Sequence, residues 1–431
     1  MTQKPWWMAH IGIGDAIVWL VPLLLIGHHF FRGRRAYLAI LGLMIVLGGG
    51  IVIRVLTVTI LHPPGWDFQA LWLYGHVAVA GANPYLPGSY HALAGPGPFV
   101  PDFEQEVLNV GAVYPPPTLL LFGSIGWMPL QVAVVPWMIV QVAACIGVII
   151  LLWRTFFPSP DREALAFTVA LVLILPATLA TFYHGQINFI AIACVLAAWR
   201  VRDRAVTGVY LVIATIMKLL YGVLGLYPLL RARWRVLAGV AGATVVASLA
   251  SIAAFGLETF VTYLRDNPAT HRMPSYYFTT FVNQSLLGTA LRLFPHPAFP
   301  IDGPPFGPPR SMVYFGSAAV VLCITVWLVW RQPRTSAGED TAFALLIPAG
   351  MLIYPWTLGN YFVLMLVPMF YLWSRRPTRG PLLWYTIALV ASMYPLTHVP
   401  GSPGIIAPLA LWGTLAVMAF AQLAEARVKL A

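Results

Sequence analysis

Apolar runs alternate with short polar segments along almost the whole chain, and this pattern predicts membrane-spanning helices. Most runs hold about 17 to 25 residues, enough for a helix to cross the roughly 30 Å hydrocarbon core of a bilayer. We place them at 13–31, 36–61, 114–130, 131–153, 164–183, 186–199, 205–230, 236–255, 311–330, 341–357, 359–373, 381–398 and 404–423. The pattern therefore predicts an all-α polytopic membrane protein.

The number of crossings depends on the middle third of the chain. Five full crossings between residues 114 and 230 would place several arginines on the outer side. Partial insertion of 114–130 and of the region around Lys218 would keep those arginines inside, where they are usually found. We expect about 11 to 13 spans in total.

Composition and charge agree with this class. Hydrophobic residues make up 59% of the 431 residues and charged residues only 9%, whereas soluble domains carry about 25% charged residues. The net charge of +11 comes from 25 basic and 14 acidic residues, and 18 of the basic ones flank the apolar runs. Such clusters set the orientation of a membrane protein, so the positive charge does not indicate a nucleic-acid partner.

With the arginine clusters inside, two long polar segments fall on the outer face. They cover residues 62–113 and 257–310 and are rich in proline and aromatic residues. We divide the chain into an extra N-terminal helix (1–35), a core (36–256) that contains the first outer loop (62–113), the second outer loop (257–310), and C-terminal helices (311–431). We expect a multi-pass protein of the cell (inner) membrane whose active site faces the periplasm or the outside.

The sequence lacks the common motifs for nucleotide binding and for metal-dependent catalysis. There is no Walker A, GxGxxG, HExxH or DxD pattern. The three cysteines, Cys145, Cys194 and Cys323, lie within apolar runs without metal-ligand spacing, so we interpret them as packing residues. We therefore predict no metal site and no cofactor.

Asp67 is a carboxylate placed just beyond the end of the run at 36–61, among aromatic residues. In an apolar, partly water-excluded cleft a carboxylate can act as general base on a hydroxyl. An aspartate before an amphipathic stretch is also typical of a helix N-cap. The two interpretations can coexist.

Two basic residues, Arg54 and Lys218, lie inside apolar runs. A charge within a span is costly, so it usually faces a partner or a wet cavity. Arg54 is near the outer end of its run and can also reach the interface by snorkelling. Lys218 lies in the middle of its run, where we favour a phosphate or carboxylate partner.

Three further polar segments interrupt the apolar pattern. His184-Gly-Gln-Ile-Asn188 joins two runs and is explained equally well by a simple interhelical turn. Asn283-Gln-Ser285 with Arg292 is the cluster in the second outer loop that best suits a sugar or a phosphate. Tyr354-Pro-Trp-Thr-Leu-Gly-Asn-Tyr361 is a break between two short runs.

Taken in order, these segments resemble the GT-C class of polyprenyl-phosphate-sugar-dependent glycosyltransferases, and most closely glycosyltransferase family 87. The resemblance runs from about Trp66 to Trp373 and is carried by Asp67 with Tyr74-Gly75 and Gly81-Ala-Asn-Pro-Tyr85, Tyr114-Pro-Pro, Gly185-Gln-Ile-Asn188, Lys218, and Asn283-Gln-Ser285. It implies a GT-C fold and a hexosyltransferase of glycolipid biosynthesis. Such an enzyme transfers a hexose, often mannose, from a polyprenyl-phosphate donor to a lipid or glycan acceptor outside the cytoplasm, with inversion.

The resemblance also implies roles for individual residues. Asp67 matches the family's first-loop aspartate, the base for the acceptor hydroxyl, and Lys218 matches a lysine near the lipid phosphate. Arg54 and Arg292 are further candidates for the donor phosphate. The residues expected to hold donor or acceptor are Tyr74, Tyr114, His184, Gln186, Asn188, Asn283, Gln284, Asn360 and Tyr361.

The chain departs from the family at one motif. Better-known members read Ser-Pro-x-Ser-Trp-x-His-His where this sequence has Tyr354-Pro-Trp-Thr-Leu-Gly-Asn-Tyr361. A histidine can protonate or hold a phosphate, whereas asparagine can only form hydrogen bonds. The departure bears on which sugar donor and which acceptor the protein uses.

Two other classes fit part of the pattern. A lipid or sugar transporter or flippase would explain the apolar mass, with Arg54 and Lys218 along a pathway. The two long outer loops and the lack of repeat symmetry argue against it. A catalytically inactive scaffold subunit predicts instead that Asp67 points away from any cavity.

Overall fold

The computed structural model describes residues 20–21, 23–25, 27–28, 31, 33, 35–61, 66–93, 110–157, 161–266, 283–294, 309–374 and 406–428. Within these ranges the regular elements are helices, and no strand occurs. The run predicted at 381–398, most of the run at 13–31, and residues 94–109, 267–282 and 295–308 of the two outer loops lie outside the described residues.

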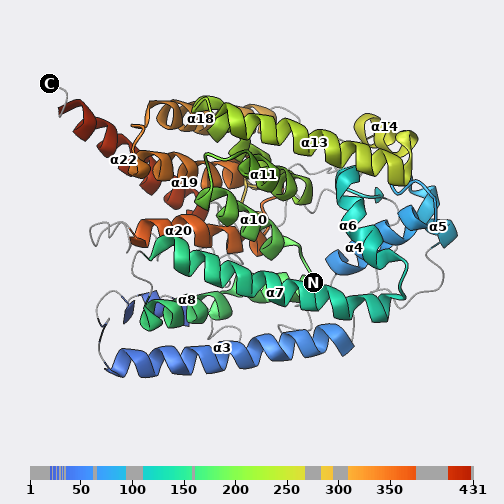
Figure 1. Ribbon diagram of the computed structural model, residues 1–431, viewed down its shortest axis with the longest axis horizontal. Coiled ribbons are helices and arrows are strands. Elements are labelled where there is room, and N and C mark those ends of the chain that lie inside the picture. The colour runs from blue at the N-terminus through green and yellow to red at the C-terminus, as the bar shows by residue number, and fades with distance from the viewer. Residues whose placement is uncertain are drawn as a thin grey trace.

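Five long apolar helices match the predicted runs. They are α3 (Arg35–Leu61), α7 (Leu130–Phe156), α13 (Trp234–Phe255), α18 (Arg310–Arg331) and α22 (Ile406–Val428). Each contains a segment long and apolar enough to cross a membrane, and the bent pair α8 (Arg162–Ile174) and α9 (Pro176–His184) would make a sixth span. In Figure 1, α3, α7, α13 and α18 lie lengthwise along the molecule. The prediction of an all-α polytopic membrane protein is confirmed.

The other apolar runs form shorter or broken helices. The run at 164–183 bends by 58° between α8 and α9, at Pro176, whose ring removes a backbone donor. The run at 205–230 divides into α11 (Ala205–Met217), η2 (Leu219–Gly225) and α12 (Leu226–Leu230). The break falls at Lys218, whose backbone is extended, with φ −151° and ψ 119°. The count of 11 to 13 spans stays a prediction, because these segments are each shorter than a full span.

Four of the shorter segments connect two chemically different ends of the bundle. They are α10 (Asn188–Arg200), α11, α19 (Ser336–Ile353), and η3 (Gly359–Met365) continued by α20 (Leu366–Ser374). One end, here called the arginine end, carries Arg154, Arg200, Arg202, Arg204, Arg231, Arg233, Arg235 and Arg331. The other, here called the loop end, carries α4 (Trp66–Val79), α5 (Gly88–Leu93), α6 (Pro116–Gly126), α14 (Leu257–Arg265) and α17 (Leu286–Leu293). Of these, α4, α5, α6 and α14 gather on the right of Figure 1.

Helices α4 and α6 cross at glycines, which lets their backbones touch. A Cβ on Gly75 would overlap the carbonyl oxygen of Phe122, and one on Gly126 would overlap the backbone of Gly75. Trp72 Nε1 donates to the carbonyl of Met128 at 2.9 Å, and His76 Nδ1 lies 2.7 Å from the carbonyl oxygen of Gly126. The close crossing fixes α4, and with it the start of the first outer loop, against the rest of the bundle.

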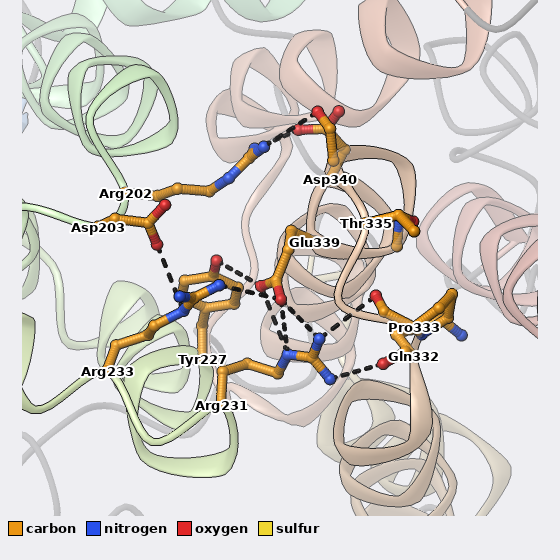
Figure 2. Close-up of polar contacts among 12 residues, drawn as sticks. Arg202, Asp203, Tyr227, Arg231, Arg233, Gln332, Pro333, Thr335, Glu339 and Asp340 are labelled. Carbon is orange, nitrogen blue, oxygen red and sulfur yellow. Dashed lines mark hydrogen bonds and ion pairs between the residues drawn. The ribbon is translucent and has the colours of Figure 1, made fainter.

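A buried charged network ties the arginine end together (Figure 2). Arg231 Nη2 donates to Glu339 Oε1 at 2.6 Å, and Arg231 Nη1 donates to the carbonyl of Gln332 at 2.7 Å. Tyr227 donates to Glu339 Oε2 at 2.7 Å, and Arg233 Nη2 lies 3.0 Å from Glu339 Oε1. The network therefore joins the corner between α12 and α13 to the connection between α18 and α19.

Replacing Glu339 with glutamine is expected to lower the free energy of unfolding by about 3 to 5 kcal/mol, because it leaves a buried guanidinium without its carboxylate. Burial alone would raise the pKa of Glu339, but hydrogen bonds and charges from Arg231, Tyr227 and Arg233 outweigh it, so the pKa lies below its usual value. This stabilisation is present above the unfolded-state pKa and disappears as the pH falls through the lower folded-state pKa. Unfolding of the detergent-purified variant measures the loss, with the exposed Glu425→Gln as matched control, and equal stability of the two variants would contradict it.

Candidate active site

Asp67 and His184 meet at the loop end, although they are far apart in the chain. Asp67 lies in the first turn of α4, which begins one residue earlier, and His184 is the last residue of α9. Asp67 Oδ2 lies 3.5 Å from His184 Nδ1, and 38% of the Asp67 side chain and 31% of the His184 side chain are exposed. The carboxylate is thus inside the helix rather than at its cap, within ion-pair distance of the imidazole, and open to a substrate.

Gly185 brings these two residues together. It ends α9 in the left-handed conformation, with φ 64°, which glycine adopts without steric cost. Its carbonyl accepts a hydrogen bond from Trp137 Nε1 at 2.7 Å, and a Cβ at this position would lie 2.7 Å from the Cβ of Phe68. The close approach sets the end of α9 directly against the residue that follows Asp67.

Lys218 contributes a buried cation beside this pair. Its side chain is 4% exposed, and Nζ lies 3.3 Å from the ring centroid of Tyr361 in η3, a cation–π contact. Among the described residues, Nζ has no hydrogen-bond partner. Lys218 interacts electrostatically with both Asp67 and His184. The ammonium is therefore available for an anion that enters the same space.

Buried amide side chains surround the same region. Asn188 Nδ2 donates to the carbonyl of Asn360 at 2.9 Å and to Thr181 Oγ1 at 3.1 Å, which joins α9, α10 and η3. The side-chain oxygens of Gln186, Asn188 and Asn360 are buried and have no hydrogen-bond partner among the described residues. Buried acceptors normally find donors, and the hydroxyl groups of a sugar would supply them.

Tyrosines form an aromatic wall around the carboxylate. The ring centroids of Tyr74 and Tyr114 lie 6.5 Å apart, and those of Tyr354 and Tyr361 lie 6.4 Å apart. Asp67 interacts electrostatically with Tyr74, Tyr114 and Tyr361. Aromatic faces suit the apolar side of a sugar ring, while the hydroxyl groups can form hydrogen bonds.

The polar cluster of the second outer loop, Asn283-Gln-Ser285, binds the backbone of the segment that leads into η3. Asn283 Nδ2 and Ser285 Oγ both donate to the carbonyl of Pro355, at 2.8 and 2.9 Å, and the backbone N–H of Gln284 donates to the carbonyl of Thr357 at 2.8 Å. The start of α17 is thus fixed to the segment that leads into η3. These hydrogen bonds hold the backbone at Pro355 and Thr357, and this backbone in turn positions Asn360 and Tyr361.

Of the two other predicted phosphate ligands, Arg292 contacts the polar cluster of the second outer loop and Arg54 lies on α3. Arg292 Nη1 donates to the carbonyl of Asn283 at 2.8 Å, so the described contacts place Arg292 beside α17. Arg54 is exposed on α3, with no ion pair among the described residues. Lys218 interacts electrostatically with Asp67, and the roles of Arg54 and Arg292 at the donor phosphate stay predictions.

The sequence did not point to several residues that shape the site. Trp137 and Thr181 lie in apolar helices, and their hydrogen bonds hold Gly185 and Asn188. The bond from Trp137 joins residues 48 apart in the chain, and the bond between Asn188 and Thr181 joins residues seven apart across the turn at Gly185, so nothing in the local sequence marks either residue. Tyr354 was recognised only as part of a chain break.

The arrangement places a carboxylate and an imidazole near a buried lysine. Asp67 can accept a proton from a hydroxyl, His184 can hold its orientation, and Lys218 can compensate negative charge in a space with little water. Among the residues that the structure describes, no three His, Cys, Asp or Glu side chains gather as a metal site would require.

Comparisons with known proteins find two similar mannosyltransferases. A polyprenol-phosphate-mannose-dependent alpha-(1-2)-phosphatidylinositol pentamannoside mannosyltransferase of Mycolicibacterium smegmatis is 28% identical over 327 residues, covering 73% of this chain and 71% of the relative. A polyprenol-phosphate-mannose-dependent alpha-(1-2)-phosphatidylinositol mannoside mannosyltransferase of the same organism is 26% identical over 313 residues, covering 68% of each chain. No solved structure is significantly similar.

The family model for glycosyltransferase family 87 matches residues 112–355. This range contains the His184 and Lys218 regions and the second outer loop, and it begins after Asp67. Because it covers more than half of the sequence, the chain belongs to glycosyltransferase family 87.

Proposed function

We propose that this protein transfers mannose from polyprenyl-phosphate mannose to a hydroxyl of a lipid or glycan acceptor, with inversion at the anomeric carbon. The observation that carries the proposal is the Asp67–His184 pair with the buried Nζ of Lys218, which has no hydrogen-bond partner among the described residues. The donor and the lipid class of the acceptor follow the names of the two mycobacterial relatives.

A single displacement uses these groups in one step. Asp67 removes the proton from the acceptor hydroxyl, and the oxygen forms a bond to the anomeric carbon. The bond between that carbon and the phosphate oxygen breaks, and its electron pair leaves with the polyprenyl phosphate towards Lys218. The proton on Asp67 then passes to solvent. An attack from the face opposite the leaving group inverts the configuration.

The distribution of charge supports an active site on the extracytoplasmic face. The arginine clusters that the positive-inside rule assigns to the cytoplasm lie at the arginine end. Helices α10 and α11 connect that end to the loop end, where Asp67 and Lys218 lie. A bilayer that holds the arginine end in the cytoplasm would leave Asp67 facing outwards.

A product analysis tests the proposal. The purified protein in detergent or nanodiscs is incubated with polyprenyl-phosphate mannose or polyprenyl-phosphate glucose, labelled at the anomeric carbon, together with native membrane lipids. We expect mannose to move to a lipid or glycan hydroxyl, with the anomeric configuration in the product opposite to that in the donor. Retained configuration would overturn the mechanism.

Two further outcomes would overturn the function itself. Transfer from the glucosyl donor alone would reject mannose. Movement of either donor across a vesicle bilayer with no product formed would favour the transporter class.

A further inference from the structure

The arginine end contains a cavity of about 620 Å³ that the transfer reaction does not use. Its walls come from the last turns of α7 and α10, the connection from α10 to α11, the first turns of α19, and the end of α20. Four arginines line it: Arg154, Arg200, Arg202 and Arg204. Ligand pockets in proteins have volumes of about 300 to 1,000 Å³, so this cavity has room for a small molecule or a lipid headgroup.

Three of the four arginines carry charge that the described residues do not neutralise. Arg202 pairs with Asp340, which also accepts a hydrogen bond from Trp199 Nε1 at 3.0 Å. Arg200 and Arg204 are exposed and have no carboxylate within ion-pair distance among the described residues. Arg154 lies over the ring of Trp153, 5.9 Å from its centroid. Asp203 also lines the cavity, but its carboxylate pairs with Arg233 at 3.3 Å.

Two other arginines at the same end, Arg231 and Arg233, are paired with a buried carboxylate. Arg231 and Arg233 both reach Glu339, and Figure 2 shows the two guanidinium groups turned towards that one carboxylate. The positive-inside rule explains why arginines lie at this end. The rule does not require that three of them line one cavity without a carboxylate partner in the described part of the chain, while Arg231 and Arg233 are neutralised.

The rest of the lining fits a phosphate group attached to an apolar body. Trp199 and Tyr371 are buried, with ring centroids 5.5 Å apart, and form an aromatic part of the wall. No side chain caps the N-terminus of α11, which begins directly after Arg204. The N-terminus of a helix favours anions, and this one begins at the residue after Arg204, which lines the cavity.

We propose that this cavity binds a ligand with a net-negative phosphate, supplied by the headgroup of an anionic lipid in the leaflet at the arginine end or by a soluble phosphate compound. Basic pockets between transmembrane helices on the cytoplasmic side commonly bind such headgroups. The site is distinct from the transfer site, because α11 begins at the cavity and ends at Lys218, a rise of about 20 Å over 13 residues.

Native mass spectrometry of the detergent-purified full chain tests the proposal. Binding is measured with phosphatidylglycerol, phosphatidylcholine and inorganic phosphate, for the wild type and for the double variant Arg200→Gln/Arg204→Gln. Each arginine near a membrane surface strengthens anionic binding roughly fivefold, so the double variant should bind about 25 times more weakly. The matched control, Arg235→Gln/Arg331→Gln, removes the same charge from exposed arginines at the same end, outside the cavity, and should bind like the wild type.

The outcomes separate the two sources of the phosphate. Binding of phosphatidylglycerol in preference to phosphatidylcholine, lost only in the cavity variant, identifies a lipid headgroup. Binding of inorganic phosphate alone, with the same variant dependence, identifies a soluble ligand. Equal binding of both lipids without phosphate binding, or equal losses in the two double variants, would overturn the proposal.

A second variant covers the case in which the double variant is unstable. Arg154→Gln alone should weaken the same binding roughly fivefold, and unchanged binding by a folded Arg154→Gln protein counts against the site. None of these measurements depends on sugar transfer. A negative binding result therefore does not count against the proposed function, and a negative transfer assay does not count against the phosphate site.

Discussion

Replacing Asp67 with asparagine is expected to lower kcat for mannosyl transfer by about 10²- to 10⁴-fold, the usual contribution of a positioned general base. Asparagine keeps the shape of the side chain and cannot accept the proton of the acceptor hydroxyl. Donor binding depends on other groups, so KM for the donor should change far less than kcat. Initial rates with labelled donor, measured over a range of donor and acceptor concentrations, give both constants.

The matched control for this variant is Glu258→Gln. Glu258 is an exposed acid in the first turn of α14, at the same end of the molecule, so its replacement should leave kcat unchanged. A kcat for Asp67→Asn close to that of the control would exclude Asp67 as the base. It would also revive the scaffold interpretation, in which this carboxylate has no chemical role.

Replacing Lys218 with methionine should have the second-largest effect, a fall in kcat of about 10²- to 10³-fold, comparable to the loss of one group that stabilises a developing negative charge. Methionine fills similar space and retains contact with the Tyr361 ring, but it cannot compensate the charge on the departing phosphate. The rate of polyprenyl phosphate release with saturating acceptor measures the effect.

Stability distinguishes a functional Lys218 from a structural one. An unpaired buried cation costs free energy, so an apolar replacement of similar size should leave the Tm unchanged or raise it. We therefore expect Lys218→Met to be inactive and at least as stable as the wild type. A large drop in Tm together with the loss of activity would show that the ammonium has a structural partner.

The long helices could be predicted because their cause is local. A helix satisfies its backbone hydrogen bonds within one segment, so an apolar run of sufficient length already specifies α3, α7, α13 and α18. Boundaries were less accurate where capping and burial decide them. The structure starts α19 at Ser336, five residues before the predicted run, because Thr335 caps it with a hydrogen bond from the N–H of Gly338 at 3.2 Å.

The site could be predicted only in part. Asp67 and Lys218 are visible in the sequence as charges in apolar surroundings. The break at Lys218 has no local signal, since no proline or glycine lies between Ile216 and Tyr221, and only the distribution of arginines favours an interruption in this region. The pairing of Asp67 with His184 depends on the glycine contact between Gly185 and Phe68, a meeting of two distant helices that single-sequence reasoning does not reach.

The short length of α10 and α11 makes the protein sensitive to the thickness of the membrane around it. Each helix has 13 residues and therefore rises about 20 Å, whereas the hydrocarbon layer is about 30 Å thick. The two ends of one such helix cannot both reach the headgroup level, so at least one end lies below it, at the depth of the hydrocarbon layer. Membranes of different thickness should therefore change the turnover of this protein even when their headgroups are identical.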